Sequence, residues 1–322
     1  MSTRHRILPV LAAVLLLGGC ALTPAPAPTS SVDAGAPFTV DNCGIQVTFD
    51  AAPKRVVTIK STATEMLLAL GLGDRIVGTG FQDGPVPDQW ADAAATLTAL
   101  ADKVPSEEVV LETQPDLVYA GWESNFSAEG AGERAELTSL GVNTYVSPSA
   151  CQSSGQPVRL SFDDVFSDIG EVASIFRLDA TELLKEQRAT LEKIEPIGDG
   201  RTALWYSSGE DTPYVGAGIG APQLVLETIG LDNIAGDLDA TWAPLSWEAI
   251  VDADPDVIVL VDATWNSAEK KIGILRSNPA TANLSAVIND RYLIVPFAAS
   301  EAGVRSVEAA KSLADQLAEL DG

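Results

Sequence analysis

Short runs of β-branched and aliphatic residues alternate with longer segments of helical periodicity along most of the chain. The first half contains four runs that are expected to be buried strands: Val56–Ile59, Ile76–Val77, Leu117–Ala120 and Val142–Val146. Helices are expected between them at Thr64–Leu70, which stops before a glycine, and at Glu129–Leu140. Alternation of this kind favours βαβ units and a mainly parallel sheet.

The middle of the chain, residues 161–196, has no strand signal and predicts two consecutive helices. The first covers Phe162–Phe176, and the second begins at Asp179 with Glu182 at the spacing of a capping box. Strand signals then resume at Ala203–Ser207, Val257–Val261 and Leu293–Val295. The pattern predicts an α/β protein of two lobes, each a mainly parallel sheet flanked by helices. The expected limits are residues 38–178 for the N-terminal lobe, 179–195 for one long connector helix and 196–322 for the C-terminal lobe.

The N-terminal segment lacks the alternation of strand and helix signals found in the rest of the chain. Arg4, His5 and Arg6 precede a mostly apolar stretch over residues 7–19, too short to cross a hydrocarbon core of roughly 30 Å as a helix. Residues 1–19 therefore predict a signal peptide. The small residues before Cys20 resemble a lipoprotein signal, cleaved before a cysteine that is then acylated; an ordinary export signal is the alternative. Residues 20–37, rich in Pro, Ala and Ser, predict a flexible tether.

Composition indicates a globular protein, since 46% of the residues are hydrophobic and 20% are charged. The formal charge is −25, and the 18 basic and 45 acidic residues from Cys20 onward give −27, which disfavours nucleic-acid binding. The single histidine, His5, lies in the expected signal peptide. The mature chain therefore has no imidazole for a Ser-His-Asp or Cys-His mechanism, or for His-ligated zinc or haem.

The chain has three cysteines, of which Cys20 is the expected acylation site. Cys43 and Cys151 then form an even pair in an oxidising compartment, which predicts a disulfide. Two buried free thiols are the alternative.

An internal repeat relates residues 106–118 to residues 246–258, with Ser, Glu, Pro and Asp at the same offsets. Each copy predicts a serine N-cap, a short helix and a Pro-Asp turn into a buried strand. Glu108 and Glu248 fall in the first turns of these helices, where a carboxylate suits the helix dipole. Helix capping alone would be enough to account for both glutamates.

Three segments carry a resemblance to a known family: Arg55–Gly78, the two E-x6-P-D units of the repeat, and P-Y-V-G at Pro213–Gly216. Together they resemble the siderophore and cobalamin class of ABC-importer substrate-binding lipoproteins, over residues 38–322. The resemblance implies two Rossmann-like lobes bridged by one long helix, with the ligand held in the cleft between them. It also implies a glutamate on the outer surface of each lobe that meets arginines of the permease, and Glu108 and Glu248 occupy those positions.

A narrower resemblance involves Lys60–Glu65, Tyr119–Asn125 and Pro213–Gln223. These segments are similar to a small branch of the family proposed to import precursors of the deazaflavin coenzyme F-420. The resemblance implies a planar ligand of that kind.

Candidate ligand-binding residues follow from the rule that ligands of α/β lobes bind beyond the carboxyl ends of the strands. Aromatic side chains there could stack on a planar ligand, and the scarce cations could neutralise a phosphate or carboxylate. The candidates are Phe81, Trp122, Trp205, Tyr206, Tyr214, Trp242 and Trp265, together with Lys60, Ser61, Thr62, Lys103 and Arg305. Ordinary packing of the rings and solvated surface cations are the alternatives.

The expected function is capture of a planar polar or anionic small molecule, such as a deazaflavin precursor, for delivery to an ABC permease with its ATPase. A ferric siderophore or a corrinoid is the alternative within the class. From another class, a histidine-free exported hydrolase would need two facing carboxylates. We expect a monomer, lipid-anchored to the outer face of the cytoplasmic membrane. No catalytic residue, metal, cofactor or nucleic-acid partner is expected.

Overall fold

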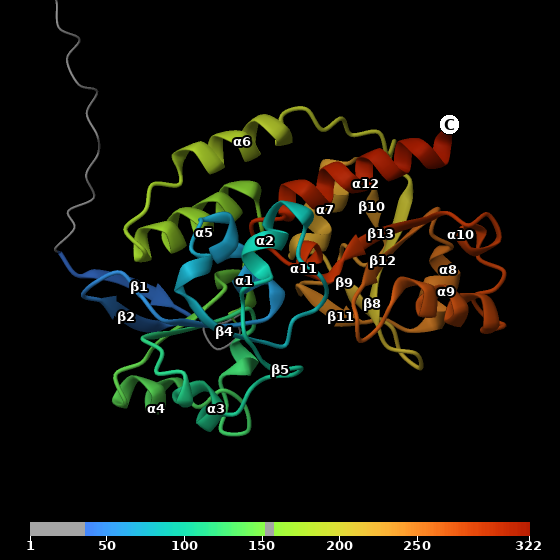
Figure 1. Ribbon diagram of the computed structural model, residues 1–322. Helices are drawn as coiled ribbons and strands as arrows, with labels where there is room; N and C mark the ends of the chain where they lie inside the picture. Colours follow the sequence, from blue (N-terminus) through green and yellow to red (C-terminus); the bar gives the residue numbers. More distant parts are fainter. Residues whose placement is uncertain (1–35, 152–157) are drawn as a thin grey trace, which may run out of the picture. The chain divides into compact units, whose positions relative to one another are not determined.

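The computed structural model describes residues 36–151 and 158–322 (Figure 1). The expected signal peptide, Cys20 and most of the expected tether lie outside the described residues. None of the helices in the described residues combines the length and the apolar character that spanning a bilayer requires.

The first half of the chain forms a five-stranded parallel sheet, here called the N-terminal sheet, with strand order β5-β4-β3-β6-β7. Its strands are β3 (Val56–Ile59), β4 (Ile76–Gly80), β5 (Ala99–Ala101), β6 (Leu117–Ala120) and β7 (Asn143–Val146). An antiparallel hairpin of β1 (Phe38–Asn42) and β2 (Ile45–Phe49) precedes it. The four strands expected from the hydrophobic runs are confirmed, and β3 and β6 are buried at every position.

The helices of this half are α1 (Ser61–Ala69), α2 (Ala91–Ala94), α3 (Glu107–Glu112), α4 (Arg134–Ser139) and α5 (Phe162–Ile175). The expectation of a helix over 129–140 was too long at its start. Gly132 adopts φ +101°, in the left-handed region, so the helical backbone begins only at Arg134.

The second half forms the C-terminal sheet, with order β11-β9-β8-β12-β13 and β10 paired to β8. Its strands are β8 (Thr202–Ser208), β9 (Tyr214–Gly216), β10 (Asp232–Asn233), β11 (Trp242–Pro244), β12 (Val257–Asp262) and β13 (Tyr292–Pro296). The pairs of β8, β12 and β13 are parallel, as expected, whereas β9 and β11 add an antiparallel edge. A tight turn at Gly209 (φ +85°) folds β9 back along β8; a Cβ there would lie 2.1 Å from the Thr212 carbonyl oxygen.

The helices of this half are α7 (Ala221–Thr228), α8 (Trp247–Ala253), α9 (Ala268–Ser277), α10 (Ser285–Ile288), α11 (Phe297–Ser300) and α12 (Ser306–Asp321). Helix α12 packs against α7, β13 and α6.

The expected connector helix is present as α6 (Thr181–Leu191), within the expected range 179–195. The expected capping box at its start is not formed, because Ala180 is the N-cap and the Asp179 carboxylate accepts the Thr181 N–H at 2.8 Å. The fold is therefore the two-lobe α/β architecture. The residue limits of the lobes stay a prediction, because Leu224, Val304 and Val307 of the second half pack in the core of the first.

The two repeat copies have the same local structure. Ser106 and Ser246 are the N-caps of α3 and α8, as predicted, and each side chain accepts a backbone N–H of the first turn. The Asp of each Pro-Asp turn then accepts backbone N–H groups at the start of the neighbouring strand: Asp116 from Lys54 and Arg55, and Asp256 from Thr202. These hydrogen bonds of the repeat therefore position the start of a central strand in each sheet, β3 in the first and β8 in the second.

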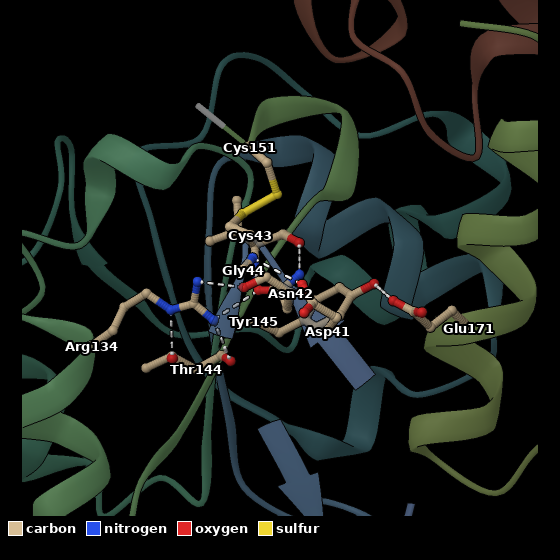
Figure 2. Close-up of a disulfide and its surroundings, with 10 residues drawn as sticks. Asp41, Asn42, Cys43, Gly44, Arg134, Thr144, Tyr145, Cys151 and Glu171 are labelled. Carbon is tan, nitrogen blue, oxygen red and sulfur yellow. Dashed lines mark hydrogen bonds between the residues drawn. A yellow bond between two sulfur atoms is a disulfide. The ribbon is translucent and has the colours of Figure 1, made fainter. Parts of the chain in front are cut away.

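The disulfide predicted between Cys43 and Cys151 is present (Figure 2). It joins the turn of the β1–β2 hairpin to the loop after β7. Beside it, the buried guanidinium of Arg134 donates to the Asn42 carbonyl and side-chain oxygens and to the Thr144 hydroxyl, each at 2.9 Å. Covalent and hydrogen-bonded links therefore hold the hairpin on the edge of the N-terminal sheet.

Removing this disulfide is expected to lower the free energy of unfolding. The two cysteines are 108 residues apart, and cross-linking a loop of that length removes denatured-state entropy equivalent to about 4 to 5 kcal/mol. Urea unfolding of Cys43→Ala/Cys151→Ala against the oxidised protein measures the loss. Addition of a reductant should change only the oxidised protein, and equal midpoints for the two would contradict the expectation.

Candidate ligand-binding site

The carboxyl ends of strands from both sheets enclose a cavity of about 310 Å³, here called the aromatic cavity. Its walls come from loops of both halves and combine aromatic rings with small hydroxyl-bearing side chains. The lining residues are Trp122, Ser124, Ser149, Ala150, Ser207, Ser208, Tyr214, Thr241, Trp242, Trp265, Phe297 and Glu301. Six of the twelve carry a hydroxyl or carboxyl group without an aromatic ring, so the cavity pairs an apolar aromatic surface with convergent polar groups, as small-molecule sites do.

The rings reach the cavity because each lies at one end of a strand or soon after it. Trp122 follows β6, Trp265 follows β12 and Phe297 follows β13 directly. Tyr214 and Trp242 begin the antiparallel strands β9 and β11, and Tyr214 and Trp265 remain 44% and 45% exposed. Rings that keep this much accessible surface can stack on a planar ligand.

Lys60, at the start of α1, is fully buried behind the aromatic wall. Its ammonium forms an ion pair with Asp83. It also lies 4.0 Å from the ring centroids of Phe81 and Trp122 and 4.4 Å from that of Phe297, within cation–π range. Burial lowers the pKa of Lys60, and the carboxylate of Asp83 opposes that shift. Lys60 is therefore held inside the wall and does not line the cavity.

The backbone at Lys60 is in a conformation that non-glycine residues rarely adopt, with φ +78°. Gly121, after β6, packs directly against it: a Cβ there would lie 2.5 Å from the Thr62 hydroxyl and 2.8 Å from the Lys60 Cβ. Strain of this kind persists only where the surroundings enforce it, and it is concentrated at functional sites.

Asp83, in the loop after β4, connects the two halves. Its backbone carbonyl accepts the Thr264 N–H at 2.9 Å, and its carboxylate accepts the Trp265 indole N–H at 3.3 Å. Ser61 holds the same loop, because its hydroxyl accepts the Asp83 N–H at 2.8 Å. One buried residue therefore ties the ion pair of the first half to the Trp265 loop of the second.

Among the described residues that line the aromatic cavity, Glu301 is the one with an acidic or basic charged side chain. Burial raises its pKa to about 7, while Lys60 lowers it, Asp83 raises it and the Trp122 indole N–H donates to its carboxylate. A group with this pKa changes charge near neutral pH.

A second cavity of about 470 Å³, here called the acidic cavity, lies against the Asp83 loop and Phe297. Glu65, Asp83, Asp88 and Asp262 line it together with Arg305. The Arg305 guanidinium is paired with Glu65 at 3.4 Å and with Glu308 at 2.7 Å. Burial raises the pKa of Glu65 to about 7, against the opposing charge of Arg305.

The structure brings part of the predicted ligand set together. Trp122, Tyr214, Trp242 and Trp265 line the aromatic cavity, and Ser61 and Arg305 line the acidic one. Lys60 and Phe81 form the wall beside them, with Thr62 buried in the same turn of α1.

Three predicted residues lie elsewhere. Trp205 and Tyr206, on β8, are fully buried in the core of the C-terminal half, where Tyr206 packs edge-on against Trp247. Lys103 is exposed and lines neither cavity. Lys60 and Arg305 were expected to neutralise an anionic ligand. In the structure, both cations are already paired with carboxylates.

Asp83, Phe297 and Glu301 were missed by sequence reasoning. The signal was available for two of them, because Asp83 comes soon after β4 and Phe297 directly after β13, as the strand-end rule requires. Glu301 lies beyond the short helix α11, and only the packing of that helix brings it to the cavity.

Comparison with known proteins agrees with this geometry. Residues 56–299 match the family model described as periplasmic binding protein. The ABC transporter substrate-binding lipoprotein YvrC of Bacillus subtilis is 27% identical over 330 residues, covering 96% of this chain and 95% of that protein. A cobalamin-binding protein of Halobacterium salinarum is also 27% identical, covering 90% of this chain and 79% of that protein.

Solved structures show the same architecture. A periplasmic binding protein from Veillonella parvula superposes with a TM-score of 0.75 at 27% identity, over 87% of this chain and 97% of that one. The structure titled as an ABC-type Fe3+-hydroxamate transport system from Saccharomonospora viridis gives 0.74 at 27% identity, over 89% and 99%. With the family model covering most of the chain and the cavity in place between the two sheets, the protein belongs to the periplasmic binding protein family, of the siderophore- and cobalamin-like ABC-transporter type.

Proposed function

We propose that this protein captures a planar small molecule in the aromatic cavity and delivers it to an ABC permease. The observation that carries the proposal is the position of three tryptophans and a tyrosine at strand ends of both sheets, around one cavity of ligand size. A ligand stacked there would touch both halves and would stabilise the arrangement of them that it binds more tightly.

Delivery requires contact with the permease, and Glu108 and Glu248 are the proposed docking residues. Both are exposed in the first turns of α3 and α8, and neither forms an ion pair with another described residue. Helix capping is performed by Ser106 and Ser246, which leaves the two carboxylates free for arginines of a partner.

Anchoring is the second part of the proposal. The relative from Bacillus subtilis is named as a lipoprotein, and the segment before Cys20 resembles a lipoprotein signal. We propose acylation at Cys20, a monomer on the outer face of the cytoplasmic membrane, and a permease driven by its own ATPase. Diacylglyceryl attachment to Cys20 would supply two chains, enough for durable anchoring.

The ligand classes to compare are deazaflavin precursors, corrinoids and ferric siderophores. The first comes from the similarity of three segments of the sequence. The other two are the classes that relatives' names state, cobalamin for the Halobacterium salinarum protein and Fe3+-hydroxamate for the Saccharomonospora viridis structure.

A thermal-shift screen of these three classes tests the proposal. A ligand at a hundredfold its Kd should add about 2.7 kcal/mol of stability. Absence of any shift in all three classes, together with unimpaired uptake after Trp242→Ala, would remove the proposed function.

For the ligand found in that screen, Trp242→Ala is expected to raise Kd by at least about tenfold, because stacking and burial of one indole are lost. Titration calorimetry measures the change. Trp90→Ala is the matched control, since Trp90 lies outside the aromatic cavity. Equal losses in both variants would show a general destabilisation instead of a lost contact.

Binding without catalysis is also proposed. A carboxylate-based hydrolase needs two facing carboxyl groups, about 5 to 9.5 Å apart. Among the described lining residues, the aromatic cavity has one carboxylate, Glu301, and it is held by Trp122. For the aromatic cavity, this supports ligand binding over the hydrolase alternative.

A further inference from the structure

The charges around the aromatic cavity are unevenly distributed. Glu301 lines it, whereas none of its described lining residues is a lysine or arginine. Lys60, the cation whose charge acts on Glu301, is buried behind the wall in its ion pair with Asp83. Arg305 is held between Glu65 and Glu308 at the other cavity. An anionic ligand would therefore meet a carboxylate and no available counter-charge.

The aromatic wall already accommodates an ammonium group. The Nζ of Lys60 lies 4.0 Å from the ring centroids of Phe81 and Trp122 and 4.4 Å from that of Phe297. Trp122 and Phe297 also line the cavity, where Trp265 packs edge-on against Phe297 at 5.4 Å between centroids. Ring faces attract cations, and the attraction is stronger in a desolvated site than in water.

We infer that the ligand of the aromatic cavity is a planar organic cation, held between indole faces with its positive charge near the Glu301 carboxylate. This inference rests on the proposed function and adds the charge of the ligand. It differs from the expectation of an anionic ligand, because that expectation depended on cations that the fold pairs internally.

The titration of Glu301 supports the same ligand class. Burial raises its pKa to about 7, so this carboxylate is costly to ionise unless a positive charge lies beside it. The charged groups that face it are Lys60 and Asp83, whose charges oppose each other, and Tyr214 is the other titratable group on the cavity wall. A bound cation would stabilise the ionised form and release a proton.

Three bicyclic probes of similar shape test the inference: 1-methylquinolinium as the cation, quinoline as the neutral ring and quinoline-2-carboxylate as the anion. Titration calorimetry at pH 8 should give the tightest binding for the cation and the weakest for the anion. Glu301→Gln should weaken the cation by at least about tenfold and the neutral ring by less than about threefold. The amide keeps an acceptor for the Trp122 N–H, and Glu129→Gln removes the same charge from an exposed loop as the control.

The pH dependence gives an independent readout. Protonation of Glu301 should weaken the cation as pH falls from 8 to 6, with no such change for quinoline or in Glu301→Gln. Equal affinities for cation and neutral ring, preference for the anion, or no binding of the cation would each overturn the inference. The proposed function would survive these results if quinoline or a ligand from the screen still bound and Trp242→Ala abolished that binding, so the two failures are distinguishable.

Discussion

Reversing both docking charges, in Glu108→Lys/Glu248→Lys, is expected to abolish uptake while leaving ligand affinity unchanged. Both residues are exposed on the first turns of α3 and α8, on helices that do not line the aromatic cavity. Arginines of a permease would then face lysines, and juxtaposed like charges cost several kcal/mol at an interface. Transport into cells measures uptake, and calorimetry on the isolated protein measures affinity.

The single reversals separate the two halves of the interaction. Each is expected to reduce uptake strongly, since one docking contact is lost. Glu129→Lys is a charge-matched control on an exposed loop and should transport normally. Normal uptake by the double variant would rule out docking through these two glutamates.

Asp83→Ala is expected to destabilise the protein by about 3 to 5 kcal/mol, the cost of removing one partner of a buried ion pair. Lys60 would be left as an uncompensated charge among three rings. The bond from Trp265 would also be lost, so the Trp265 loop should become more mobile. Urea unfolding measures the first effect, and hydrogen exchange of residues 263–267 measures the second.

Two comparisons make this expectation specific. Lys60→Met/Asp83→Asn should be less destabilised than Asp83→Ala, because no buried charge remains and the amide can still accept from Trp265. Asp163→Ala breaks an exposed ion pair with Arg188 and should cost less than about 1 kcal/mol. A loss of that small size in Asp83→Ala would show that the ion pair is not a major source of stability.

Particular elements show how far the hydrophobic pattern could predict the fold. The runs Val56–Ile59 and Val257–Val261 predicted central strands, and the structure has them as β3 and β12. The connector helix was predicted from the absence of strand signals and from its helical periodicity, and it is present as α6. The antiparallel edge of β9 and β11 was not predicted, since such short segments carry little periodicity.

The candidate site was only partly predictable, for a reason visible at β8. Trp205 and Tyr206 lie in a strand of the C-terminal sheet, as expected, but within the strand and not beyond its end. They therefore pack into the core instead of lining the cavity. A shift of two or three residues along a strand decides between these environments, and sequence patterns do not locate strand ends that accurately.

By itself, the sequence determined the class of the protein: two α/β lobes, one connector helix, a cysteine pair suited to a disulfide and a repeat with a glutamate in the first helical turn of each copy. These features depend on local periodicity, capping residues and the number of cysteines, all of which can be read directly from the amino-acid sequence. Only the tertiary structure decided the charge of the site. Asp83 and Lys60 are 23 residues apart, and Arg305 and Glu65 are 240 apart. Whether a cation is free for a ligand depends on which carboxylate the folded chain places beside it, because a Coulomb interaction depends on distance in space.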